Sequence, residues 1–198
     1  MLIEPLTPDG KTMARGGLMR GWKGVLLKHG LLERVCGRLT PEVISLVREP
    51  PASTEWVDVA HYECVAEAVL QEAGEARLAD LFVDATRTGW AVLISRWSGS
   101  IVRVFGASPA TVLKHAEAAA KANTVGFALE WSSQSPSSGE LIAHYPFRKR
   151  MHFGAAWGTS AACQLAADAV GATMKRARPI IEPRPEGGLR VRAPVSWT

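Results

Sequence analysis

Two kinds of hydrophobic spacing divide the chain near Asn123. Before this residue, apolar side chains recur every three or four positions, which is the period of an amphipathic α-helix. After it, the period becomes two, which is typical of β-strands with one buried face. The pattern therefore predicts a front half made of helices and a rear half made largely of strands.

Prolines and glycines set the expected bounds of the helices. Gly24 and Gly30 interrupt the first helical stretch, so that stretch fits one helix or two shorter ones equally well. Thr40 followed by Pro41 is typical of a helix start. Gly74 is expected to form a short loop between two long helices that pack on each other. The predicted helices cover residues 18–39, 41–49, 59–73, 78–93 and 109–122, and residues 98–106 fit a helical turn or a brief strand.

The rear half predicts a hairpin, a helix and two further strands. Alternating apolar residues in segments 125–131 and 141–145 flank a polar turn, which indicates the hairpin. Small residues from Gly154 to Val170 form a helix that ends at Gly171. The last two strands are expected at 172–181 and 189–197. The expected fold is α+β, with an N-terminal helical layer packed on a twisted, mainly antiparallel sheet and a β-β-α-β-β order at the C-terminal end.

Length and composition describe one ordinary domain. The 198 residues are 47% hydrophobic and 21% charged, which excludes a wholly disordered chain. We expect residues 1–16 to form an N-terminal arm and residues 17–198 to form a single ligand-binding-like domain. Cys36, Cys64 and Cys163 are too few and too widely spaced for a disulfide framework, and the start of the chain lacks the features of a signal peptide. These observations favour the cytoplasm, and no apolar run is long enough to span a membrane.

Candidate catalytic and metal-binding residues are few. His61 and Cys64 share one helical face, but a metal site would need a third ligand from a distant residue such as His144, His152 or Cys163. The same pair with Asp58 suggests a Cys-His-Asp nucleophile, although three groups on one helical segment constrain its geometry poorly. His115 is a candidate axial ligand for haem, but its neighbours indicate a solvated helix face. We therefore predict neither catalytic residues nor a metal site, and the sequence names no cofactor.

Seven tryptophans are the least ordinary feature of the composition. Most of them are expected in the core, but three lie at the ends of predicted elements, where an indole can line a cleft between helices and sheet. Two tyrosines complete the predicted ligand pocket, which consists of Trp56, Tyr62, Trp97, Trp131 and Tyr145.

Basic residues suggest a second kind of site. Arginines cluster after the hairpin and on the outward face of the last strands, where they would suit phosphates or an acidic protein. A solvated sheet face explains them equally well, and no aromatic residues are interleaved with them as nucleic-acid binding would favour. The predicted anion or partner patch consists of Arg148, Lys149, Arg150, Arg176, Arg178, Arg190 and Arg192.

Four segments carry a resemblance to a known family. They are Gly17–Leu27, Trp56–Tyr62, Ser108–Leu113 and Leu189–Trp197, and together they resemble small proteins of a family expanded in myxobacteria. That family is similar to the ligand-binding fold of haem-nitric-oxide-binding sensors, vinyl-reductase-type domains and TRAPP subunits. The resemblance implies a helical layer over an antiparallel sheet, with an apolar pocket between them and no catalysis. Haem itself is not implied, because the Tyr-x-Ser-x-Arg motif of the haem-binding branch is absent.

These observations lead to three hypotheses about function. The first is a non-enzymatic cytoplasmic sensory or regulatory domain that binds a small apolar ligand, with a protein partner expected and a homodimer as one form of it. The second is a basic module that binds an acidic protein through the arginine face of the last hairpin. A nucleic acid is the less favoured partner for the same face. The third is an enzyme that uses His61 and Cys64.

Overall fold

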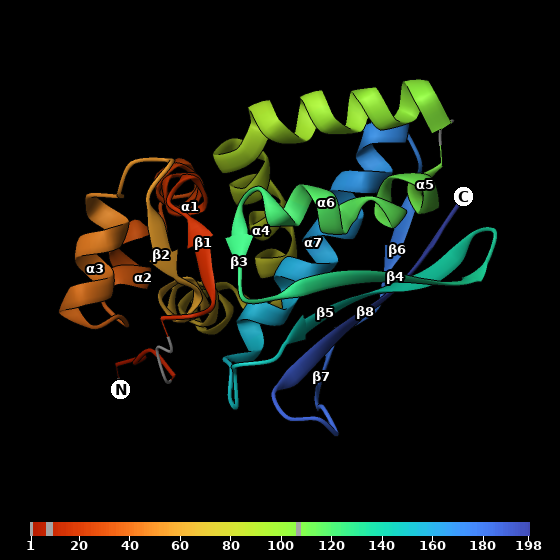
Figure 1. The fold of residues 1–198 in the computed structure, drawn as a ribbon. Helices are drawn as coiled ribbons and strands as arrows, with labels where there is room; N and C mark the ends of the chain where they lie inside the picture. Colours follow the sequence, from red (N-terminus) through yellow and green to blue (C-terminus); the bar gives the residue numbers. More distant parts are fainter. Residues whose placement is uncertain (1, 7–9, 106–107) are drawn as a thin grey trace.

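The computed structural model describes residues 2–6, 10–105 and 108–198, and for residues 90–105, 116 and 119 it describes the backbone alone. The front half is helical, as predicted (Figure 1). Its helices are α1 (Gly17–Lys28), α2 (Leu32–Cys36), α3 (Pro41–Arg48) and α4 (Val59–Phe105). The first stretch thus forms two pieces, and Gly30, with a φ of +64°, lies between them.

Helix α4 differs from the prediction of two helices. The structure assigns helix from Val59 to Phe105 without an intervening loop, and the ambiguous segment after residue 98 is helical up to Phe105. Gly74 has a φ of +80°, a value foreign to regular right-handed helix. The two predicted stretches therefore meet directly at Gly74, where the backbone changes conformation at a single residue.

A small antiparallel sheet joins the two halves of the chain. Its strands are β1 (Met13–Arg15), β2 (Trp56–Asp58) and β3 (Thr124–Val125), in the order β2-β1-β3. The sequence did not predict these strands, because two or three residues are too short to show an alternating pattern. Strand β1 lies within the segment 1–16 that was expected to be an arm.

The larger sheet is antiparallel throughout. It contains β4 (Ala128–Ser135), β5 (Ser138–Tyr145), β8 (Leu189–Trp197) and β6 (Met174–Arg176) in that spatial order, and β7 (Ile180–Pro183) also pairs with β8. The β4–β5 hairpin confirms the prediction. The strand predicted at 172–181 is instead two strands, separated near Pro179, which has no backbone N–H to donate to a ladder.

Three helices cover one face of this sheet. They are α5 (Pro109–Lys114), α6 (Ala116–Lys121) and α7 (Phe153–Val170), and α7 lies between α4 and the strands (Figure 1). A Cβ atom at Gly154 would lie 2.7 Å from the carbonyl oxygen of Ala66, so glycine allows α7 to approach α4 closely. The predicted α+β fold, with helices packed on an antiparallel sheet, is confirmed.

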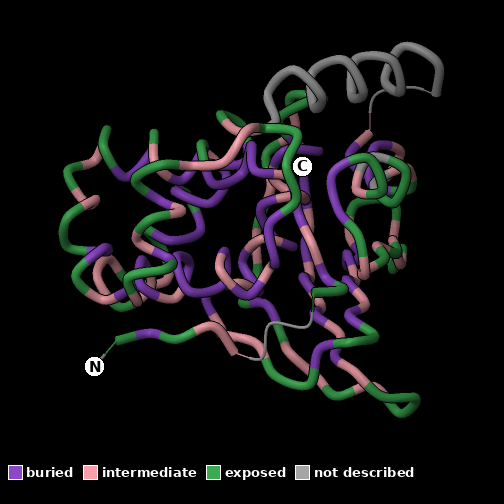
Figure 2. The backbone as a smooth tube through the Cα atoms, turned by 60° about the vertical axis from the view of Figure 1, so that its left-hand side comes forward, coloured by how far each residue is buried: buried purple, intermediate pink, exposed green. Residues whose placement is uncertain are grey.

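The buried residues form one large cluster and two smaller ones. The large cluster joins α1 to α4 and α7, and the two smaller clusters lie where α5 and α7 face the sheet. Figure 2 shows the buried segments running through the middle of the molecule. Among the described residues, no helix combines the length and the apolar character that crossing a membrane would require.

Candidate functional site

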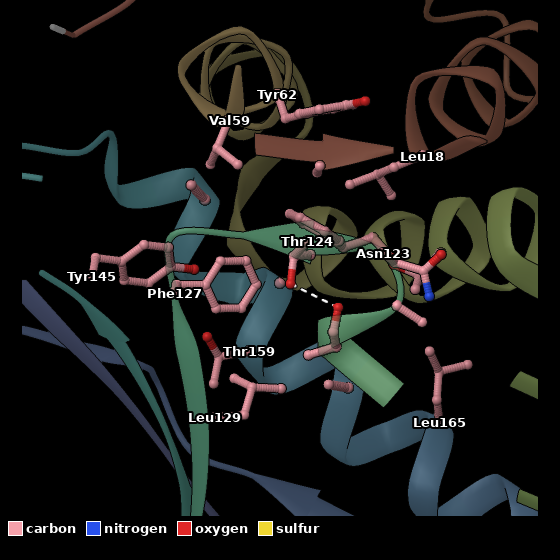
Figure 3. Close-up of a pocket in the computed structure, with 18 of the residues that line it drawn as sticks. Leu18, Val59, Tyr62, Asn123, Thr124, Phe127, Leu129, Tyr145, Thr159 and Leu165 are labelled. Carbon is pink, nitrogen blue, oxygen red and sulfur yellow. Dashed lines mark hydrogen bonds between the residues drawn. The ribbon is translucent and has the colours of Figure 1, made fainter. Parts of the chain in front are cut away.

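A cavity of about 270 Å³ lies where the helices, the small sheet and the large sheet meet. Strand β1 and helices α1 and α4 form one side of it, and α5, α6, α7 and strands β4 and β5 form the others. In Figure 3, Val59 and Tyr62 lie on one side of the cavity and Leu129 and Leu165 lie on the opposite side. Most of the lining side chains are apolar, so the cavity suits a small apolar molecule.

Small residues on α7 leave room for this cavity. Ala155, Gly158, Thr159 and Ala162 all line it, and they lie on successive turns of one helix. The sequence showed these small residues on the predicted helix from Gly154 to Val170, but their spacing did not show that they face a cavity. Gly158 also allows Phe82 of α4 to approach α7, because a Cβ atom at Gly158 would lie 2.9 Å from the Phe82 ring.

Two tyrosines and a phenylalanine form the aromatic part of the wall. Tyr145 stacks on Phe127 with 5.0 Å between ring centroids and 29° between ring planes (Figure 3). Tyr62 donates a hydrogen bond from its hydroxyl to the carbonyl oxygen of Arg15 at 2.9 Å, which holds its ring in place. Burial raises the pKa of both tyrosines far above the ordinary value, so they stay protonated phenols.

A buried ionic cluster lies at the wall beside Tyr62. Glu63 lines the cavity, and its Oε2 accepts a hydrogen bond from Arg148 Nη2 at 2.6 Å. The side chains of Glu63 and Arg148 are 0% and 1% exposed. Asp58 Oδ1 lies 3.8 Å from Arg148 Nη1 and accepts a hydrogen bond from the backbone N–H of Ala60 at 2.8 Å, near the start of α4. Burial is the main cause that raises the pKa of Glu63 to about 8, and the charge of Arg148 opposes it.

The structure brings together two of the five predicted pocket residues. Tyr62 and Tyr145 both line the cavity. Trp56 lies outside it, under the Arg15 guanidinium at 3.8 Å from the ring centroid. Trp131 packs against Trp197, with 5.7 Å between ring centroids, in a cluster next to the cavity. Trp97 falls in the part of α4 whose side chains lie outside the description.

The predicted basic patch is divided between buried, paired and exposed residues. Arg148 is buried, whereas Lys149 and Arg150 are exposed. The remaining arginines form ion pairs with carboxylates: Arg176 with Asp80 at 2.7 Å, Arg178 with Glu75 at 2.6 Å, Arg190 with Glu182 at 2.6 Å, and Arg192 with Glu140 at 2.8 Å. The seven residues therefore do not share one open positive surface.

The candidate nucleophile and metal ligands are used in other ways. His61 contacts Glu42, with 3.1 Å between Nε2 and Oε1. Cys64 is fully buried, and burial raises the pKa of its thiol to about 12, which keeps it protonated and unreactive. Cys163 is buried with a pKa raised to about 12 for the same reason. Within the described residues, no three histidine, cysteine or acidic side chains gather closely enough to hold a metal ion.

Glu63 and Arg148 are the functional candidates that sequence reasoning misplaced or missed. Glu63 falls four residues after Val59 and three before Ala66, so it lies on the apolar face of its helix. A carboxylate on the apolar face of a helix was the sequence signal that could have identified Glu63 as a candidate. Arg148 was grouped with its exposed neighbours, and only the folded chain shows that it is buried.

Comparisons with known proteins give a consistent result. No model of a known protein family matches the chain, and no curated protein matches it significantly. Solved structures of H-NOX proteins do match. The Fe(II) unliganded H-NOX protein from K. algicida has 10% identity and a TM-score of 0.60, with 93% of this chain and 96% of that chain covered. A Cs H-NOX mutant with 4-cyano-L-phenylalanine at site 5 has 11% identity and a TM-score of 0.57, with 93% and 96% covered. The F78L Tt H-NOX has 13% identity and a TM-score of 0.52, with 93% and 95% covered.

These matches support the haem-nitric-oxide-binding part of the predicted resemblance. The myxobacterial family and the vinyl-reductase-type and TRAPP folds stay predictions. The identities are too low to carry a function across, but the coverage of both chains is nearly complete. Over most of its length, the chain has an H-NOX-like fold.

Proposed function

We propose that this chain is a non-enzymatic sensory or regulatory domain that holds a small apolar molecule in the cavity. The observation that supports this proposal is the cavity itself, which is largely apolar, about 270 Å³ in volume, and lined by elements from both halves of the chain. This volume is near the lower end of ordinary ligand pockets, so the expected ligand is small. The H-NOX-like fold supports the proposal, since those neighbours include proteins described by their iron and haem.

The residues at the cavity do not fit a haem group. A haem iron needs an axial ligand such as histidine, cysteinate or tyrosinate, or methionine paired with histidine. The described lining residues include no histidine and no cysteine. Tyr62 and Tyr145 are protonated phenols, and His115 lies outside the lining, at the junction of α5 and α6. The proposed ligand is therefore a molecule other than haem.

The position of the cavity suits a sensory role. Its wall includes Ala14 on β1 and Leu18 on α1, as well as Leu129 on β4 and Leu165 on α7. A bound molecule would touch all of these elements at once and would favour the arrangement that fits it best. Occupancy would then be transmitted to surfaces on both halves of the molecule, where a protein partner can detect it.

Native mass spectrometry combined with a cavity-filling variant tests the proposal. We expect protein purified from its own host to retain a small molecule as added mass. Ala162→Trp places an indole in the cavity and should abolish the added mass. Ala169→Trp introduces the same side chain at an exposed position of the same helix and should leave the added mass unchanged. If the wild-type protein carries no molecule and takes up none from a panel of small apolar compounds, the proposal fails.

The basic-module alternative has less support, because four of its arginines are already paired with carboxylates. A salt titration against a polyanion separates the two, since a steep loss of affinity with salt belongs to the alternative alone. We also propose that residues 17–198 form a single ligand-binding-like domain and that residues 1–16 form an arm docked on it, with Ala14 of the arm contributing to the cavity wall. A protein partner, a homodimer and a cytoplasmic location stay predictions.

A further inference from the structure

One polar atom at the cavity wall lacks a hydrogen-bond partner among the described residues. Glu63 lines the cavity and is 0% exposed, yet its Oε1 has no partner. The other oxygen, Oε2, is satisfied by Arg148. A buried polar atom without a partner destabilises the folded state, and native proteins rarely leave one unpaired. Oε1 is therefore the atom that a bound molecule would satisfy.

Burial favours the protonated form of Glu63 and outweighs Arg148 and a backbone hydrogen bond from His152, which both favour its anion. Arg148 is shared between two carboxyl groups, because it also faces Asp58. Asp58 accepts hydrogen bonds from the backbone N–H groups of Gly10 and Ala60. One guanidinium then balances one carboxylate, and Glu63 completes a neutral cluster as the acid. The pKa of about 8 agrees with this assignment.

The position of the acid proton follows from the hydrogen bond to Arg148. Because Oε2 accepts from the guanidinium, the proton belongs on Oε1, where it is a donor without an acceptor. A molecule with an oxygen atom at this point would accept that hydrogen bond. A negatively charged head group would leave a net charge buried beside the Asp58–Arg148 pair, which is costly. A pure hydrocarbon would leave Oε1 unsatisfied.

We propose that Glu63 is the polar anchor of the cavity and that the ligand is a small apolar molecule with one neutral oxygen head group, a ketone or an alcohol, hydrogen-bonded to Oε1. This inference rests on the proposed function and names its ligand class. The hydrocarbon part of the ligand lies against the apolar wall that Leu129 and Leu165 form on the far side of the cavity (Figure 3).

Three probes of similar shape test the head group by calorimetric titration. Propylbenzene has no head group, 2-phenylethanol has a hydroxyl, and phenylacetate is an anion at neutral pH. We expect the wild-type protein to bind the first two. Phenylacetate should bind at least about tenfold more weakly than the alcohol, because its negative charge has no counter-ion to spare in the neutral cluster.

Two variants of Glu63 separate the hydrogen bond from the shape of the site. Glu63→Met removes the donor and should weaken 2-phenylethanol binding by about tenfold or more while leaving propylbenzene within about threefold. Glu63→Gln keeps a donor in the same place, because its amide oxygen can accept from Arg148 while its N–H₂ faces the cavity. It should retain alcohol affinity within about threefold.

A measurement on the wild-type protein covers the case in which Glu63→Met does not fold. The infrared carbonyl stretch of bound phenylacetone, labelled with ¹³C at the carbonyl, should be lower than in hexane because of the hydrogen bond. An unshifted stretch would overturn the assignment. If propylbenzene binds but Glu63→Met weakens both probes equally, the head-group inference fails and the proposed function stands. If none of the probes binds, both fail.

Discussion

The Glu63–Arg148 pair allows a quantitative test of the buried cluster. Its atoms are 2.6 Å apart and both side chains are almost completely buried. Arg148 donates to Glu63 and is the counter-ion of Asp58, and removing it leaves a buried carboxylate without compensation, which typically costs about 3–5 kcal/mol. Arg148→Met should therefore lower the free energy of unfolding by about 3–5 kcal/mol. For a chain of this length, each kcal/mol shifts the Tm by about 2–4 °C, so we expect a drop of about 6–20 °C.

The double variant provides the control. Glu63→Met with Arg148→Met removes both members of the pair and leaves Asp58 without its guanidinium, so the double variant should be no less stable than Arg148→Met alone. Urea unfolding of the four proteins gives the coupling energy, which we expect to exceed about 2 kcal/mol. Additive effects of the two substitutions, or a single-variant cost below about 1 kcal/mol, would refute the assignment of a tightly coupled buried pair.

Three further predictions follow from the structure. First, the pKa of Glu63 is about 8 in the folded protein and 4.5 in the unfolded chain, so the stability that Glu63 contributes is complete below pH 4.5 and is lost as the pH rises through 8. The free energy of unfolding should fall by up to about 1.4 kcal/mol per pH unit in this range. Urea unfolding should show this slope in the wild type and not in Glu63→Gln, and equal slopes in the two proteins would contradict the prediction. Second, Gly21→Ala should destabilise the folded protein by about 2 kcal/mol or more, because its Cβ atom would overlap the carbonyl oxygen of Ala85. Gly24→Ala should stabilise it by about 0.5–1 kcal/mol, because its Cβ atom would meet only Thr88, at 3.9 Å. Thermal unfolding that ranks the two variants in the opposite order would disprove this packing of α1 on α4. Third, burial raises the pKa of the Cys64 and Cys163 thiols to about 12, so both thiols should react with an aromatic disulfide reagent at pH 8 only as fast as the protein unfolds. Rapid labelling of these two cysteines in the native protein would show that their thiols are accessible and would contradict the prediction.

The parts of the fold with long periodic patterns could be predicted from the sequence. The Thr40-Pro41 start of α3, the β4–β5 hairpin and the end of α7 at Gly171 each depend on local residues and were predicted correctly. Strands β1 to β3 were missed, because strands this short depend on partners distant in sequence rather than on their own pattern.

The candidate site was predictable only in part, for a similar reason. Tyr62 and Tyr145 lie at the cavity, but the pairing of Glu63 with Arg148 joins residues separated by 85 positions. Local spacing carries no signal for such a contact. The tryptophans at the ends of elements were good candidates for a ligand pocket by residue type, yet Trp131 packs against Trp197 instead of lining the cavity.

The most direct test of the central claim is a titration of the wild-type protein with propylbenzene, followed by NMR. We expect saturable chemical-shift changes centred on the residues that line the cavity, Phe127, Leu129, Thr159 and Leu165 among them. Ala162→Trp should remove these changes, and Ala169→Trp should keep them. Absence of saturable shifts in the wild type, or shifts that centre on another part of the molecule, would contradict the account.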